Sequence, residues 1–222
     1  MRGALTAVFL ICLAAVPGVA SAAFERVPRN PADRLVREPI DDERYDRAER
    51  CRRSPMRGTR ALEDWLDRHA RGSSWGIMRC EKLGEDNYSL HAEGRALDWH
   101  LDAARRGERR EASRIIALLL APDRLGNERA LARRMGVQEI IYNCRAWFAG
   151  GERMRPYSVC YDKRGRRKRR VNRTAAHRDH IHFGLSRRGG AGRTSFWAAA
   201  RRADRRRAAA RRADRRRAAA RR

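Results

Sequence analysis

Histidines gather at two places in this sequence, and their spacing suits a shared metal ion. Residues 89–100 and 177–183 together hold five of the six histidines. Within the first cluster, a single helix would separate His91 and Asp98 by about 10 Å. Two ligands that each lie about 2 Å from one zinc ion cannot be so far apart. The chain must therefore bend between His91 and Asp98 if both are to bind the same ion.

Gly94 provides a position for that bend, because glycine adopts turn conformations without a Cβ penalty. The alternating residues that follow, 95–101, predict a strand on which every second side chain shares a face. Asp98 then lies on the same face as Ala96, whose small side chain leaves room beside a metal.

The second cluster contains His180 and His182, and it lies in a predicted strand over residues 179–185. Their i, i+2 spacing points both rings to one face of that strand. Two histidines and one carboxylate would leave the fourth position of a tetrahedral zinc ion free for water. That arrangement is typical of a catalytic site and not of a closed structural site.

Both clusters resemble the motifs of a known group of enzymes. Ser89-x-His91-x-x-Gly94-x-Ala96-x-Asp98 is similar to the signature of the D-Ala-D-Ala metallopeptidases, and His180-x-His182 is similar to their second metal motif. The wider group includes lysostaphin-type endopeptidases and the hedgehog-like domain. The sequence most resembles exported actinobacterial proteins of the hedgehog/DD-peptidase fold, and the resemblance covers roughly residues 51–197.

The resemblance implies that one zinc ion is bound by His91, Asp98 and His182. It also implies that His180 is the catalytic acid or base and that His177 lines the same site. In that scheme His180 transfers protons between the attacking water and the leaving amine, and His177 donates to the oxyanion.

Other residues near these motifs are open to more than one interpretation. A carboxypeptidase needs a cation for the terminal carboxylate of its substrate, and Arg79 is the candidate because its short strand should lie near His91. Asp179 is either a partner of a ligating imidazole or, because strand alternation places it opposite His180, a surface residue. His100 is expected to pack between tryptophans. Three further residues form either the pocket wall or ordinary core and turn: Tyr142, Asn143 and Trp147.

The function that follows is that of a secreted zinc peptidase acting on peptidoglycan stem peptides. The sequence does not distinguish a D,D-carboxypeptidase from an endopeptidase, because both would use the same residues. The alternative is an inactive protein that keeps the peptidase fold and binds the cell wall or another anionic polymer.

The fold class predicted from the apolar patterns is α+β, with a small, mostly antiparallel sheet and flanking helices. Helices are expected over residues 59–72, 111–121 and 127–135, with Thr59 and Asn127 as N-caps. Strands are expected over residues 75–79, 95–101, 137–142 and 179–185.

The chain is expected to divide into four parts. Residues 1–22 have the basic start, apolar run and small-residue end of a secretory signal peptide. Residues 23–50 are polar and indicate a linker or a loosely packed arm. Residues 51–197 form the peptidase-like domain, and residues 198–222 form an exposed Ala/Arg-rich repeat. We expect secretion, and no segment is long and apolar enough to span a membrane.

Cysteine usage agrees with export. Cys12 lies in the signal peptide, and an even number remains: Cys51, Cys80, Cys144 and Cys160. Four cysteines allow three pairings, of which we favour the sequence-local one, 51 with 80 and 144 with 160. A cysteine zinc site is the weaker alternative, because no C-x-x-C spacing occurs.

The formal net charge is +26, which bears on partners more than on fold. The tail, residues 198–222, carries 12 Arg and 2 Asp in a ten-residue repeat. Such a segment can bind anionic wall polymers, or it can be an exposed tail without a partner. No aromatic residue lies among its arginines, which disfavours specific nucleic-acid binding. A second basic run, residues 163–170, is either a clamp for anionic polymer beside the site or a solvated loop.

Overall fold

The computed structural model describes residues 30–85 and 87–220, and its centre is a six-stranded antiparallel sheet. The spatial strand order is β1-β4-β8-β5-β6-β7. These strands are β1 (Ser73–Gly76), β4 (Ala96–His100), β5 (Val137–Tyr142), β6 (Arg145–Phe148), β7 (Arg155–Pro156) and β8 (His180–Leu185). A separate hairpin pairs β2 (Lys82–Gly84) with β3 (Asn87–Tyr88).

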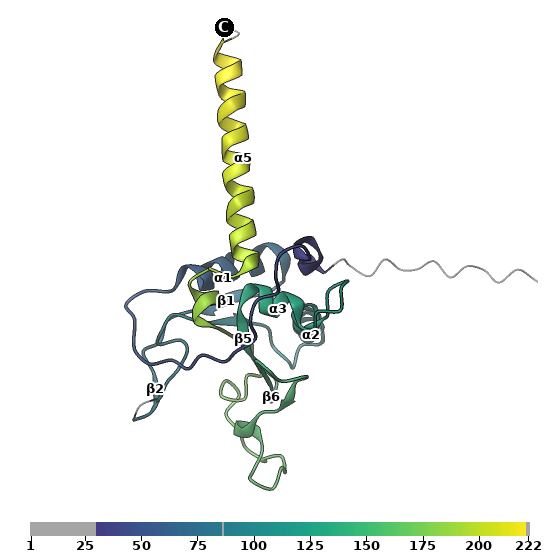
Figure 1. Cartoon of the computed structure of the whole chain (residues 1–222). Coiled ribbons are helices and arrows are strands. Elements are labelled where there is room, and N and C mark those ends of the chain that lie inside the picture. The colour runs from purple at the N-terminus through teal and green to yellow at the C-terminus, as the bar shows by residue number, and fades with distance from the viewer. Residues whose placement is uncertain (1–29, 86, 221–222) are drawn as a thin grey trace, which may run out of the picture.

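Helices flank one face of this sheet (Figure 1). They are α1 (Arg57–His69), α2 (Arg106–Leu120), α3 (Ala130–Met135) and the short α4 (Arg187–Gly190). Two short 3₁₀ helices, η1 (Pro31–Leu35) and η2 (Ser158–Cys160), and the long α5 (Ser195–Ala220) complete the described chain. The expected α+β class with a small antiparallel sheet and flanking helices is therefore confirmed.

Alternation along the central strands separates an apolar face from a polar face. Leu97, Ile140 and Phe183 are fully buried and belong to the main core with side chains of α1, α2 and α3. Asp98 and His182, the pair next to Leu97 and Phe183 in the register of β4 and β8, lie on the opposite face. The helices thus bury one face of the sheet, and the other face is left to hold the polar groups.

Two expected N-caps are wrong. Helix α1 begins at Arg57 with Met56 as its N-cap, and Thr59 is buried within the first turn. The Thr59 hydroxyl donates instead to the carbonyl oxygen of Gly94, at 2.7 Å. Asn127 likewise precedes α3, and its amide donates to the carboxylate of Asp123. Both polar side chains are used for contacts between segments, which a local pattern cannot reveal.

Other element boundaries differ from the sequence prediction by a few residues. Strand β1 ends at Gly76, so Arg79 lies beyond the sheet in the connection to β2. Helix α2 begins at Arg106, five residues before the predicted start at 111. The apolar pattern missed these residues because they are charged and mostly exposed. The short strands β2, β3, β6 and β7 were not predicted.

The described part of the N-terminal arm, residues 30–50, contacts the domain along its length. Ala32 in η1 is fully buried. The guanidinium of Arg129 donates two hydrogen bonds to the carboxylate of Glu43, at 2.6 and 2.9 Å. Polar residues of the arm, whose composition predicted a linker or loose arm, thus form contacts with the domain. The predicted signal peptide, residues 1–22, lies outside the described residues.

Two disulfides join the pairs that the sequence favoured. Cys51 pairs with Cys80 and Cys144 pairs with Cys160, with Cα–Cα distances of 5.4 and 5.6 Å. Within the described residues, none of the helices combines the length and apolar character that crossing a membrane requires.

Helix α5 is anchored at its first turn and then leaves the domain (Figure 1). The indole of Trp197 is buried and donates to the carbonyl oxygen of Met135, at 2.8 Å. From Arg202 to Ala220 every residue is exposed. Apart from the ion pair of Arg202 with Glu38, at 2.7 Å, no hydrogen bond or ion pair joins this part of the helix to the rest of the described chain.

Candidate metal centre

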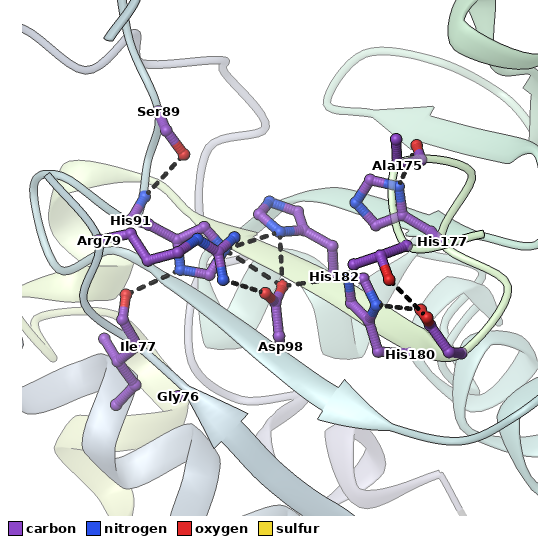
Figure 2. A network of polar contacts seen from close by, with 12 residues as sticks. Gly76, Ile77, Arg79, Ser89, His91, Asp98, Ala175, His177, His180 and His182 are labelled. Atoms are coloured by element: carbon purple, nitrogen blue, oxygen red, sulfur yellow. Dashed lines mark hydrogen bonds and ion pairs between the residues drawn. The ribbon is translucent and has the colours of Figure 1, made fainter. Parts of the chain in front are cut away.

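Three side chains from distant parts of the sequence converge on one point on the polar face of the sheet (Figure 2). Asp98 on β4 lies directly opposite His182 on β8 in the antiparallel register. His91 comes from the turn that precedes β4. His91 Nε2 lies 3.1 Å from both Asp98 Oδ1 and His182 Nδ1, and the last two atoms are 3.0 Å apart.

The turn that delivers His91 depends on Gly94. This residue has a φ of +66°, which is strained for residues with a Cβ. A Cβ at Gly94 would lie 2.9 Å from Met78 Sδ and from Pro55 Cα. The carbonyl oxygen of Gly94 also accepts from the Thr59 hydroxyl and from the Met56 amide. The bend predicted between His91 and Asp98 is therefore present, and it is fastened to the start of α1.

The chemistry of the three converging atoms suits a cation. The ring of His91 directs Nδ1 to the carbonyl oxygen of Ile77, at 2.8 Å, which fixes the proton on Nδ1 and leaves a lone pair on Nε2. That lone pair faces a carboxylate oxygen and a second imidazole nitrogen. Donors around a tetrahedral zinc ion lie about 3.3 Å apart, close to the separations found here. His91, Asp98 and His182 are all buried, and together they can hold a metal ion.

Electrostatics in this group favour an ionised carboxylate. Burial alone would raise the pKa of Asp98, but the hydrogen bond and charge of His182 outweigh burial and hold that pKa far below its usual range. Burial lowers the pKa of His91. For His182, burial is outweighed by contact with Asp98 and the charge of Glu139, so its pKa is raised. The site therefore presents a charged oxygen and a neutral His91 nitrogen to a bound ion.

His180 lies beside this group (Figure 2), and Asp179 holds its ring. His180 Nδ1 is 2.7 Å from Asp179 Oδ1, and the other oxygen of Asp179 accepts from the Thr174 hydroxyl at 2.7 Å. Since the carboxylate accepts, the proton of His180 lies on Nδ1 and its Nε2 is left facing the site, 3.5 Å from Asp98 Oδ1. Asp179 therefore contacts an imidazole, but it is that of His180 and not that of either converging histidine, His91 or His182.

His177 lies next to His180, as the resemblance implied. The two ring centroids are 4.7 Å apart, and the centroid of His182 is 5.6 Å from that of His177. Burial, and then the charges of His182 and His180, lower the pKa of His177 to about 3, so its ring is neutral near pH 7. Its Nδ1 lies 3.2 Å from the carbonyl oxygen of Ala175. This tautomer leaves Nε2 as a proton acceptor, which does not favour the oxyanion donation that we expected.

Arg79 reaches the site but is engaged with a ligand residue. Its Nη1 donates to Asp98 Oδ2 at 2.6 Å, and its side chain is 49% exposed. Arg79 therefore holds the oxygen of Asp98 that does not face the histidines. Its Nε lies 3.9 Å from Glu81 Oε2, and Arg79 also lines the cavity.

A cavity of about 710 Å³ opens over the three converging residues. One wall is formed by the arm and the β2–β3 hairpin, and the other by residues between Tyr157 and His177. Tyr142 and Trp147 are buried in the main core and do not line this cavity. Asn143 lies in the turn after β5, with a φ of 45°. His100 packs on Trp75, with ring centroids 4.6 Å apart, as expected for a packing residue.

Two residues at this site were missed from the sequence. Glu139 on β5 lies 3.8 Å from the outer nitrogen of His182, Nε2. Tyr45 in the arm donates its hydroxyl to Glu139 Oε2 at 2.9 Å. Glu139 lies in a segment predicted as a core strand, and Tyr45 lies in a segment predicted as a linker or loose arm. Neither segment contains a metal motif, so no signal in the sequence indicated these two residues.

Comparison with known proteins places the chain in a family. The model of the family described as VldE, C-terminal domain, matches residues 54–177. The chain belongs to this family. The VldE match includes His91, Asp98 and His177, ends before His180 and His182, and begins after the arm. A search of curated proteins and a search of solved structures find no match.

Proposed function

We propose that this protein is a secreted, zinc-dependent peptidase that acts on peptidoglycan stem peptides. The observation that carries the proposal is the convergence of His91, Asp98 and His182 at mutual distances of 3.0–3.1 Å beneath an open cavity. The similarity of the two motifs to those of D-Ala-D-Ala metallopeptidases of the hedgehog/DD-peptidase fold supports the substrate class. Two disulfides are compatible with secretion.

Two histidines and one carboxylate are a donor set that suits zinc. A zinc ion with three protein ligands supplies a water of lowered pKa and polarises a carbonyl oxygen. Arg79 keeps the second oxygen of Asp98 occupied, which favours binding through Oδ1 alone.

His180 is the residue best placed to move a proton. Asp179 fixes its tautomer, and its free Nε2 faces the open side of the metal site. That nitrogen can take a proton from a water in the cavity and return it to the leaving amine. His177, neutral and 4.7 Å from His180 between ring centroids, can accept a proton from the same region. Arg79, whose side chain is 49% exposed and lines the cavity, can contact a substrate carboxylate.

The test is hydrolysis of peptidoglycan fragments by the zinc-loaded protein. We expect release of an amine that stops when a chelator is added. Mass spectrometry of the products distinguishes loss of a terminal D-alanine, by a D,D-carboxypeptidase, from opening of a cross-link, by an endopeptidase. Zinc-loaded protein that binds wall fragments but does not cleave them would contradict the proposal.

The variant His180→Ala separates proton transfer from metal binding. It should lower turnover by about 10²–10⁴-fold, the usual contribution of general acid–base catalysis. The bound zinc should remain at one ion per chain, since His180 is not among the three converging ligands. His69→Ala is the matched control, because His69 stacks on Trp65 in α1, away from the cavity. Loss of zinc in His180→Ala would make His180 a ligand instead.

A second candidate function is binding of an anionic wall polymer without catalysis. Helix α5 favours it, because its arginines are exposed from Arg202 onward and project from the domain (Figure 1). One protein can both bind polymer and cleave peptides. The hydrolysis assay distinguishes the two functions, because a protein that only binds retains wall material and releases no chelator-sensitive product.

A further inference from the structure

The contacts of the arm point to a role for it in the metal centre. We propose that Tyr45 acts through Glu139 as a positioning residue, holding His182 with Nδ1 toward the metal. The inference rests on the metal site of the proposed function, but it does not depend on the substrate or on catalysis. The VldE match, residues 54–177, includes Glu139 but neither Tyr45 nor His182.

One carboxylate links the arm to the ligand. Tyr45 donates to Glu139 Oε2 at 2.9 Å, and Glu139 Oε1 lies 3.8 Å from His182 Nε2. The opposite nitrogen of the same imidazole, Nδ1, lies 3.0 Å from Asp98 Oδ1 at the metal position. The nitrogen of a histidine that binds a metal is set by the partner of the other nitrogen. A negative charge at Nε2 therefore keeps the proton there and leaves the lone pair on Nδ1.

The surroundings of Glu139 keep its carboxylate close to His182. Only 8% of Glu139 and 7% of His182 are exposed, so solvent screens their attraction weakly. Glu139 is paired in register with Gly184, two residues after His182. A Cβ at Gly184 would lie 2.9 Å from the Cβ of Glu139. The absence of a side chain at Gly184 gives Glu139 the room to lie on this face of the sheet.

The arm is clamped immediately after Tyr45. Gln138 and Asp46 exchange two hydrogen bonds, at 2.8 and 2.9 Å. The guanidinium of Arg95 is buried, pairs with Glu93 at 2.7 Å and donates to the carbonyl oxygens of Asp46 and Arg47. These contacts fix the backbone beside Tyr45, so its hydroxyl is delivered to Glu139 by a rigid segment.

The Tyr45 hydroxyl is suited to remain a donor. Burial, and then the negative charge and hydrogen bond of Glu139, raise the pKa of Tyr45 above its usual value. The hydroxyl therefore stays protonated near neutral pH, where it can donate to Glu139. A protonated phenol can orient the carboxylate without competing with His182 for its charge.

The test measures the affinity of the full chain for zinc alone, by competition with a chelator. Glu139→Gln should weaken zinc binding by about 10-fold or more, as expected for loss of the partner of a ligating histidine. Tyr45→Phe should weaken it by about 2–10-fold, because it removes one hydrogen bond to a charged group. In the double variant, the loss should equal that of Glu139→Gln alone, because Tyr45 acts only through Glu139.

Two controls distinguish positioning from general loosening of the arm. Glu43→Gln weakens the contact of the arm with Arg129, and Tyr161→Phe removes a hydroxyl outside the cavity. Both should leave zinc affinity within about twofold of the unmodified chain, even if Glu43→Gln lowers stability. Tyr45→Phe keeps the ring, so it provides the test even if Glu139→Gln does not fold.

The outcomes are distinct. Unchanged zinc affinity in Tyr45→Phe, losses that add in the double variant, or an equal loss in Glu43→Gln would each overturn the inference. If zinc affinity responds as expected and no peptide is cleaved, the peptidase proposal fails while the role of Tyr45 stands.

Discussion

Asp98 contacts three other residues of the candidate site through its two carboxylate oxygens. Its Oδ1 faces His91 and His182, while its Oδ2 accepts from Arg79. The carboxylate is buried, so each of its contacts is made in a medium that screens charge weakly. A single short side chain therefore fixes the metal position and the orientation of an arginine at the cavity edge.

Gly94 is the residue that makes this convergence possible, and Gly94→Ala tests it. The added Cβ would meet Met78 and Pro55 at 2.9 Å, in a backbone conformation with φ +66°. We expect a loss of about 2–4 kcal/mol in the free energy of unfolding, from backbone strain and overpacking together. Zinc affinity should fall as well, because His91 is displaced. Urea denaturation and chelator competition measure the two effects.

Gly107→Ala is the matched control for Gly94→Ala. Gly107 lies in α2, and a Cβ there would meet nothing within 4 Å. Alanine favours a helix over glycine by about 0.5–1 kcal/mol, so this variant should be as stable as the unmodified chain or more so. If Gly94→Ala were tolerated equally well, the turn would not need glycine.

At the scale of elements, local patterns predicted which side chains share a face of each strand, but not which other segments those side chains contact. The alternation around Asp98 and His182 predicted two strands with the correct faces, and the structure places them as direct neighbours. Glu139 could not be assigned from the sequence, because its role depends on the pairing of β5 with β8 and on the space at Gly184. Tyr45 depends on a contact across 94 residues of sequence.

The same limit explains the errors at helix starts. Thr59 and Asn127 have the residue types of N-caps, and local rules assign them that role. Each instead bonds to a group that folding brings near it, the carbonyl oxygen of Gly94 and the carboxylate of Asp123. A pattern read along the chain has no information about such partners.

The two disulfides support different parts of the cavity, and removing them one at a time should show it. Cys144–Cys160 packs against Ala176, next to His177, and so supports one cavity wall. Replacing both cysteines by alanine should lower stability by about 3 kcal/mol, as for other loops of similar length. Hydrogen exchange over residues 157–177 should become faster, while zinc affinity changes little because no ligand lies in that wall.

Cys51–Cys80 provides the contrast. Cys80 follows Arg79, and the amide of Arg52, next to Cys51, donates to the carbonyl oxygen of Ala92. Replacing this pair should therefore weaken zinc binding as well as stability. Equal zinc affinities in the two double variants would contradict this division of roles.

At the scale of the whole molecule, the two densest basic segments, α5 and residues 163–170, are far from each other. Helix α5 leaves the domain on the side opposite the green segment that contains residues 163–170 (Figure 1). The 26 residues of α5 correspond to a length of about 39 Å. Beyond Arg202 its residues are alanine, arginine and aspartate, so the helix has no large apolar side chain to insert into a core or a bilayer.

Deleting residues 203–222 tests whether α5 tethers the protein to an anionic wall polymer. The deletion keeps Trp197 and the contact of Arg202 with Glu38, so the domain should lose less than about 0.5 kcal/mol of stability. Retention on immobilised poly(glycerol phosphate) should weaken and become less dependent on salt, because fewer arginine–phosphate contacts form and fewer counterions are released on binding. Hydrolysis of a short soluble peptide should persist. Replacing the same arginines by lysine keeps the charge and should keep retention, whereas unchanged retention after the deletion would exclude the tether and leave α5 as a solvated helix.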